Sequence, residues 1–357
     1  NTLQWEVFGP KISSTLEAGL RLHGDDVVRL HTEDPYAMCD RSLTPTGGAT
    51  ETTLDSHATA RALAAHLHED LQINAIHLLP GLRMEIIDSS MEVEGEAPQE
   101  SVTRTSWMPG MATLLNVGEW TDVFAGAHRG FSPVAPGQPE DVQPESSWNY
   151  EMGARASIGD LYGETVGFFN DYKNLTGQCT LSGGCTGEDI DRQYNGGEVW
   201  VYGLEWVGGH TALLENGLEI PFEATYTWTK SHFQTGFVSD FPQFGTVEAG
   251  DSLPYVAEHQ ASARVGMNHA RFGLSTGITA RSGMLDESGQ FPIEETDIPP
   301  LFLLDAAAHT TVKERWKVYL TGTNLTGSTA ITSWRPMGAR PTAPFQIMAG
   351  LKLDVPG

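Results

Sequence analysis

Apolar and polar residues alternate along the chain from Trp316 onward. Trp316, Val318 and Leu320 fall on one parity, and mostly polar residues fall on the other. A period of two is that of a β-strand whose two faces meet different environments. The sequence N-L-T-G at 324–327 breaks this pattern, and the segment Pro344–Val355 is strand-like again. These features predict two strands that are separated by a long loop.

The same alternation recurs along the whole chain and predicts about 15 strands. The predicted strands are Thr2–Ile12, Thr15–Val28, His57–Leu71, Ala75–Ile87, Val102–Leu115, Thr121–Arg129, Trp148–Ala156, Leu161–Asn170, Glu198–Trp206, Ile220–Lys230, His259–Met267, Phe272–Arg281, Leu301–Val312, Trp316–Thr323 and Pro344–Val355. Short turns alternate with loops of about 15 to 25 residues. The first long loop is expected at about 30–55, and the second carries Glu92, Glu94, Glu96 and Glu100.

This arrangement of short turns and long loops is typical of outer-membrane barrels, whose long loops all lie outside the cell. The two faces of the predicted strands agree with a barrel in a membrane, because Ile76, Leu78 and Leu82 lie on one face while Arg83 and Glu85 lie on the other. We therefore expect an all-β fold, a transmembrane antiparallel β-barrel with long extracellular loops and short periplasmic turns. The alternative is a β-sandwich with one buried face.

The chain of 357 residues carries a formal net charge of −25, which argues against nucleic acid as a partner. The acidity has two interpretations, a solvated surface or long acidic loops that attract cations or cationic chelates. Hydrophobic residues make up 39% of the sequence, so the composition is not that of a disordered chain.

The three cysteines suggest one disulfide. Cys179 and Cys185 bracket the turn-like sequence T-L-S-G-G, and a bond between them implies an oxidising compartment. Cys39 is left over and is expected to be free, unless it pairs outside this chain.

No motif of a catalytic site is present, so we do not expect an enzyme. His66 and His68 share one strand face at a spacing that can chelate a metal, but the sequence suggests no third ligand nearby, and polar residues that face the lumen are the simpler interpretation. The acidic side chains around the first loop offer a second candidate cation site, with solvated loop charge as its alternative; they are Asp25, Asp26, Asp34 and Asp40. We predict no resident metal and no cofactor.

Several motifs, in order and spacing, carry a resemblance to a known family. They are L-L-P-G-L-R-M-E (78–85), D-V-F-A-G-A-H-R-G-F-S-P (122–133), P-E-S-S-W-N-Y-E-M-G-A-R (144–155), F-F-N-D-Y-K-N-L-T-G (168–177), N-G-G-E-V-W-V-Y-G-L-E-W (195–206), L-P-Y-V-A-E-H-Q (253–260), N-L-T-G (324–327) and A-R-P (339–341). The chain resembles the C-terminal two-thirds of a TonB-dependent outer-membrane receptor of the ferric dicitrate receptor kind.

The resemblance implies a 22-stranded barrel, of which about 15 strands lie in residues 1–357. It implies uptake of ferric chelates, cobalamin or other scarce nutrients in the bacterial outer membrane, among lipid and lipopolysaccharide. An N-terminal plug with a TonB box would couple transport to the TonB–ExbB–ExbD complex. We expect the plug and the first strands to lie outside this sequence, which also departs from the family by ending in L-K-L-D-V-P-G rather than in an aromatic residue.

If the ligand is an anionic ferric chelate, arginines near the loops should bind its carboxylates. The candidates are Arg29, Arg41, Arg129 and Arg335, with His31 and His128 as possible assistants. The remaining charged residues of the lumen are expected to form ion pairs along the wall or to contact a plug; they are Arg83, Glu85, Glu151 and Arg155.

Three functions fit these observations. The first is a receptor that imports a ferric citrate or siderophore complex. The second is a plug-less or split barrel subunit with a structural or docking role beside other barrel segments. The third is a soluble carbohydrate-binding or adhesin-like β protein, which would purify without detergent.

Overall fold

The computed structural model describes residues 2–9, 11–95, 100–138, 142–180, 183, 185, 190, 192–294, 297–312, 315–335 and 338–353. Several predictions lie outside these residues: the place of Glu96 in the second loop, part of the sequence between the paired cysteines, the turn at 313–314 and the last residues of the final strand. Within the described part of the chain, no helix is long and apolar enough to cross a membrane.

One large antiparallel sheet of 15 strands dominates the described part of the molecule, and each of its strands pairs with the next one along the sheet. Its strands are β1 (Thr2–Phe8), β2 (Ile12–Glu33), β5 (Glu51–Ile73), β6 (Ile76–Val93), β7 (Val102–Asn116), β8 (Thr121–Ser132), β9 (Glu145–Ile158), β10 (Leu161–Lys173), β13 (Val199–Leu213), β14 (Glu219–Phe233), β17 (His259–His269), β18 (Phe272–Arg281), β19 (Leu301–Val312), β20 (Trp316–Thr323) and β23 (Gln346–Leu353). The predicted number of strands and their up-and-down order are confirmed.

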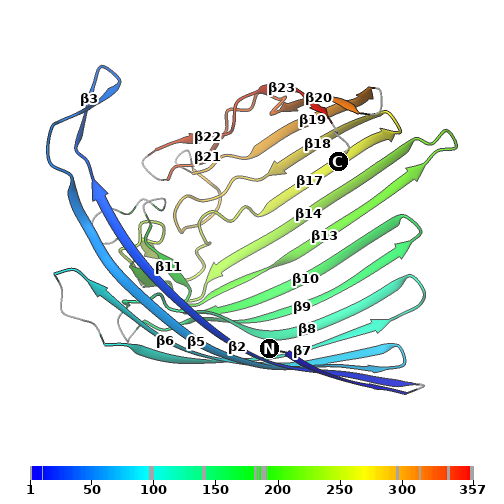
Figure 1. The fold of residues 1–357 in the computed structure, drawn as a ribbon, viewed down its shortest axis with the longest axis horizontal. Coiled ribbons are helices and arrows are strands. Elements are labelled where there is room, and N and C mark those ends of the chain that lie inside the picture. Colours follow the sequence, from blue (N-terminus) through cyan, green and yellow to red (C-terminus); the bar gives the residue numbers. More distant parts are fainter. Residues whose placement is uncertain are drawn as a thin grey trace.

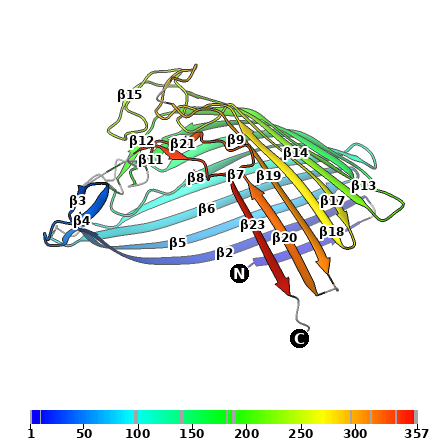
Figure 2. The same ribbon diagram turned by 90° about the horizontal axis from the view of Figure 1, so that it is seen from above.

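Four small two-stranded sheets lie in the long loops. They pair β3 (Tyr36–Cys39) with β4 (Ser42–Pro45), β11 (Thr176–Gln178) with β12 (Gln193–Asn195), β15 (Phe237–Val238) with β16 (Thr246–Val247), and β21 (Ile331–Ser333) with β22 (Arg340–Pro341). All four lie at one end of the large sheet, and the short turns lie at the other end (Figures 1 and 2). The predicted asymmetry of loops and turns is therefore confirmed.

The boundaries of the first strands differ from the prediction. The loop expected at 30–55 is shorter, because the β2–β5 pairing continues as far as Glu33 and Glu51. Ile12 begins β2 instead of ending the first strand, and Glu92 lies within β6 rather than in a loop. Polar residues have weak strand propensity, and only the pairing with a neighbouring strand holds them extended.

The two faces of the sheet differ as the alternation predicted. Met84 pairs with Trp107, and Trp206 pairs with Tyr226, on a face where large apolar side chains are exposed. On this outer face, ring contacts run from strand to strand, with centroids 6.1 Å apart for Tyr150 and Phe169. Such a band of exposed aromatic side chains suits the boundary between lipid and water.

The inner face carries the polar side chains and is partly covered by loops. Arg83 donates from Nε to Glu85 over 2.7 Å, so the predicted ion pair along the wall is confirmed. Arg155 instead pairs with Asp122 of the adjacent strand, over 2.8 Å. The two edge strands, β1 and β23, do not pair with each other, and the sheet curls without closing (Figure 1).

Candidate ligand-binding site

The loop end of the sheet contains a hydrophobic core of its own. The predicted disulfide between Cys179 and Cys185 is confirmed, and both cysteines are buried. They pack with Phe233, Phe241 and Phe244, whose rings meet edge to face. The cysteines come from the loop after β10, and the phenylalanines come from the end of β14 and the loop after it, so the core fixes those two loops against each other.

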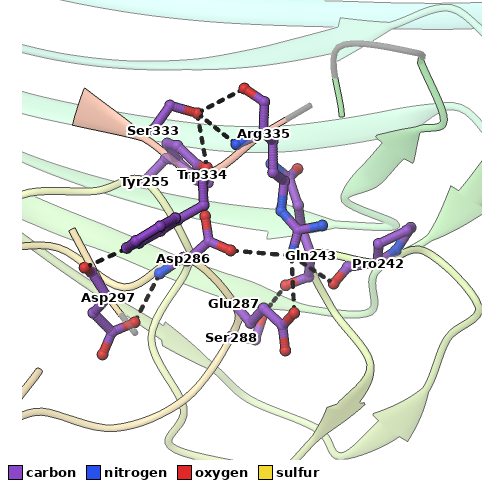
Figure 3. Close-up of polar contacts among 10 residues, drawn as sticks. All are labelled: Pro242, Gln243, Tyr255, Asp286, Glu287, Ser288, Asp297, Ser333, Trp334 and Arg335. Carbon is purple, nitrogen blue, oxygen red and sulfur yellow. Dashed lines mark hydrogen bonds and ion pairs between the residues drawn. The ribbon is translucent and has the colours of Figure 1, made fainter. Parts of the chain in front are cut away.

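A polar network joins three further loop segments (Figure 3). Arg335, from the loop between β20 and β23, lies 3.2 Å from Asp286 and 2.9 Å from Glu287, which belong to the loop after β18. Its guanidinium also donates to the carbonyl of Pro242, in the loop after β14. The side chains of Arg335 and Asp286 are each only 14% exposed. We call these three loop segments, 234–258, 282–300 and 324–345, the locked loops.

Tyr255 and Asp297 extend the same network (Figure 3). Tyr255 donates its hydroxyl to Asp286, and Asp297 accepts hydrogen bonds from the amides of Asp286 and Glu294. The indole of Trp334 donates to the carbonyl of Asp297 over 3.2 Å. Burial, and then the bond to Asp286, raises the pKa of Tyr255 above its usual value of 10.0. A tyrosine hydroxyl is already neutral at physiological pH, and the raised pKa extends its role as a donor to more alkaline pH.

The predicted site residues do not converge on one point. Arg29 lies on the inner face of β2 opposite the buried Ser56, and His31 lies two residues further along the same strand. Arg41 lies in the turn between β3 and β4, exposed and with a positive φ of 65°. Arg335 lies in the network just described, with Nη2 bound to carboxylates and a carbonyl. Binding of a chelate by these residues stays a prediction.

His128 and Arg129 lie on opposite faces of β8, because neighbouring side chains of a strand point to opposite sides. Arg129 pairs with Trp148, whose side chain is exposed on the outer face. His128 pairs with Asn149 and lines a polar cavity of about 340 Å³ on the inner face. Only His128 of the two can therefore reach the lumen from this position.

The polar cavity around His128 is lined mainly by groups that accept hydrogen bonds, among them Glu145 and Glu151. Glu145 accepts from the amide of Thr176. The side chains of His128, Glu151 and Asn170 make no hydrogen bond to another residue that the structure describes. These side chains can meet a ligand or another polypeptide segment without first breaking an existing contact.

A larger cavity of about 540 Å³ lies beside it, between the inner face of β2, β5 and β6 and the chain after β8. Arg21 and four alanines of β5 line it, and none of these residues was among the predicted site residues. The sequence does contain a signal for them, since alanine recurs at every second position in A-T-A-R-A-L-A, residues 58–64.

The described residues contain no group of three or more His, Cys, Asp or Glu side chains that could hold a metal ion. His66 lies 3.2 Å from Glu17, the residue that pairs with His68 across the strands. The aspartates near the first loop are also engaged, since Asp25 contacts His23 and Asp26 contacts His57.

Comparison with known proteins agrees with this architecture. A family model described as TonB dependent receptor-like, beta-barrel, matches residues 2–325. No curated protein matches in sequence.

Solved structures with the same fold include the unliganded ferric citrate transporter FecA, with a TM-score of 0.77, 17% identity and coverage of 98% of this chain and 53% of that one. The ferric-catecholate import receptor Fiu from E. coli K12, in its closed form, has a TM-score of 0.73 and 15% identity, and the match covers 99% of this chain and 53% of that one. The siderophore receptor PiuA from Acinetobacter baumannii has a TM-score of 0.75 and 12% identity, and the match covers 99% of this chain and 55% of that one.

The chain therefore spans about half the length of the solved structures that it matches. At these identities the structural likeness shows the fold alone, whereas the family model covers most of the sequence. From this match, together with the barrel wall and the loops gathered at one end, we conclude that the chain belongs to the TonB-dependent receptors and that it is an outer-membrane β-barrel protein.

Proposed function

We propose that this chain forms part of a receptor that imports a ferric chelate, of the ferric citrate or siderophore type, across the outer membrane. The observation that carries the proposal is the pair of cavities on the inner wall, at the loop end of a TonB-dependent receptor barrel. A ligand that arrives from outside meets these cavities before it meets the rest of the lumen. The names of the structural neighbours, which include a ferric citrate transporter and siderophore receptors, support the same class of ligand.

Transport in this proposal involves no covalent chemistry and no resident cofactor. A plug would close the barrel, and its rearrangement by the TonB–ExbB–ExbD complex would release the chelate inward. Wall residues such as Arg155 and Glu151 offer charged or hydrogen-bonding groups toward such a plug. Residues 1–357 would then supply the C-terminal part of the barrel domain.

The open edges of the sheet bear on the second candidate, a split or plug-less barrel subunit. β1 and β23 each leave one side unpaired. Unpaired backbone groups are costly in lipid, so these edges must pair with other strands in the membrane. Strands of the same polypeptide would satisfy the receptor hypothesis, and strands of a separate chain would favour the split subunit.

Uptake of radioactive iron by cells tests the proposal. The complete gene product would be expressed in a strain that lacks its own ferric citrate and siderophore receptors, with and without TonB. We expect uptake of at least one ferric chelate, and we expect it to vanish without TonB. Correctly inserted protein that gives no uptake of any ferric chelate would refute the transport function. The intact mass of the protein extracted in detergent would then tell whether a separate chain completes the barrel.

A further inference from the structure

The inner face of β5 is a column of four small side chains. They are Ala58, Ala60, Ala62 and Ala64, which alternate with larger residues of the outer face, such as Leu63. The lumen-facing side of an outer-membrane barrel is usually polar. Here a continuous apolar strip replaces the polar side chains, and its small size leaves space above the strand.

Longer side chains stand on both sides of this strip. Ala64 pairs with Arg21 on β2 and with Glu85 on β6, and Ala62 pairs with His23 and Ile87 in the next inward-facing row. The alanines therefore form the floor of a trough between two rows of longer side chains. The shape of the cavity follows directly from the strand register.

The segment that follows β8 covers this trough. Pro133, Val134 and Pro136 line the cavity from above, and Val134 is buried. The amide of Ala135 donates to Oε1 of Gln193 over 2.9 Å, which ties the cover to β12. Two prolines and this bond hold the segment in place, so the cavity exists before any ligand arrives.

Arg21 differs from the other charged side chains of the lining. Arg83 is bound to Glu85, and Asp25 accepts from His23 over 2.8 Å. The side chain of Arg21 makes no hydrogen bond or ion pair to any residue whose position is described. An anion in the cavity could pair with its guanidinium through two parallel hydrogen bonds.

We propose that this cavity binds a compact organic anion with a flat apolar part, which lies on the alanine floor while its charge pairs with Arg21. The volume of about 540 Å³ is within the usual range for a small-molecule site. An apolar floor and cover favour a ring or a short hydrocarbon over a fully hydrated ion, because they cannot replace the hydrogen bonds of water. The adjoining polar cavity, with its two glutamates, lacks both features.

This inference rests on the proposed function and specifies its ligand as an anionic chelate with apolar chelating groups. The test measures binding of radioactive iron, as ferric catecholate and as ferric citrate, to the purified complete protein in detergent. Both complexes are anionic, but only catecholate has apolar rings. We expect tighter binding of ferric catecholate. We also expect Ala62→Leu and Arg21→Gln each to weaken it about ten-fold or more, by filling the cavity and by removing the charge.

Ala65→Leu is the matched control, because Ala65 lies one strand position beyond Ala64 and faces outward, opposite Leu20. It adds the same side-chain volume without entering the cavity, and we expect unchanged binding. Heat-modifiable migration on gels verifies that each variant forms a barrel. If Ala62→Leu prevents barrel formation, Arg21→Gln still decides the result, since it leaves the packing of the trough intact.

The outcomes separate the two proposals. If the unaltered protein binds neither complex, the proposed function fails, and this inference fails with it. If ferric catecholate binds and neither Ala62→Leu nor Arg21→Gln changes its affinity, the function stands and the cavity is not the site. Equal binding of the two complexes overturns the requirement for an apolar part.

Discussion

The loop between β2 and β5 and the locked loops are built differently, although both lie at the same end of the barrel. Residues 34–50 form the β3–β4 hairpin, which stands apart from the other loops (Figure 1). Within the described structure, the hydrogen bonds of these residues join them only to one another, as between Thr46 and Pro35. The locked loops instead share a buried apolar cluster, an ion network and a backbone bridge between Ser252 and Gly289.

This contrast shows that the length of a loop alone does not determine how firmly the loop is held. A segment with few buried contacts opens locally at little cost in free energy, whereas a segment with its own core opens only with that core. We therefore expect the β3–β4 hairpin to exchange its amide hydrogens rapidly and the locked loops to exchange them slowly. Four predictions test this difference, and they begin with the largest effect.

Phe233→Ala should loosen the locked loops most. Phe233 is 1% exposed and packs against Phe237 and Phe244, so its removal leaves a cavity. The free energy of local opening should fall by about 3–5 kcal/mol, as measured by hydrogen exchange of loop peptides. Met38→Ala in the β3–β4 hairpin is the control; Met38 is 68% exposed, and exchange there should change by less than about 0.5 kcal/mol. Equal changes in hydrogen exchange for Phe233→Ala and Met38→Ala would show that the locked loops and the β3–β4 hairpin do not differ in local stability.

Replacing Cys179 and Cys185 together by Ala should have the second largest effect. The disulfide closes a short loop, with a sequence separation of 6, and the loss of this constraint should lower local stability by about 2 kcal/mol. Limited proteolysis of the detergent-solubilised protein should then reveal new cleavage between β10 and β13. Cys39→Ala serves as the control, because Cys39 is exposed and unpaired. An unchanged cleavage pattern in the double variant would show that the phenylalanine core alone fixes this loop.

Arg335→Ala should separate the three loop segments of the network. It leaves Asp286 poorly solvated and without its cation, at an expected cost of about 2 kcal/mol in local opening. A double-mutant cycle with Asp286→Asn measures the coupling, which should exceed about 0.5 kcal/mol. Arg41→Ala in the exposed turn should have no effect on hydrogen exchange in either region. Additive effects at Arg335 and Asp286 would show that the pair does not join the loops.

The smallest expected effect is a dependence on alkaline pH. The pKa of Tyr255 is raised in the folded loops, so its contribution to stability is complete below the unfolded value of 10.0 and is lost as pH rises through the folded pKa. Hydrogen exchange of the locked loops, corrected for intrinsic rates, should therefore accelerate above about pH 10. Tyr255→Phe should lack this dependence. The same acceleration in that variant would assign the effect to another group.

Much of the fold was predictable because strand alternation depends on local chemistry. The alternation around Trp316 and Met84 reflects lipid on one side and water on the other, and this pattern does not require knowledge of the neighbouring strands. The disulfide was predictable for a similar reason, since Cys179 and Cys185 are close in sequence. The ends of β2 and β5 were not, because polar residues there are extended only through pairing with each other.

The site was less predictable than the fold. Arginine was a reasonable candidate for binding an anion, yet the alternation that predicts strands also places Arg129 on the face opposite His128. The partner of Arg335 could not be inferred, because Asp286 lies about 50 residues away in another loop. Arg21 was overlooked. Its importance depends on its side chain having no partner among the described residues, whereas Arg83 and Asp25 beside it are both paired.

The order of residues along the chain is enough to predict the class of this protein: an antiparallel barrel wall with two contrasting faces, long loops at one end and one short-range disulfide. Each of these properties follows from periodicity or from residues that are neighbours in the chain. The folded molecule was needed to see which loops are locked together, which arginines already have partners and where the alanine floor becomes a covered cavity. Those properties depend on strand register and on contacts between distant loops, and the free energy of such contacts is not encoded in any single local segment.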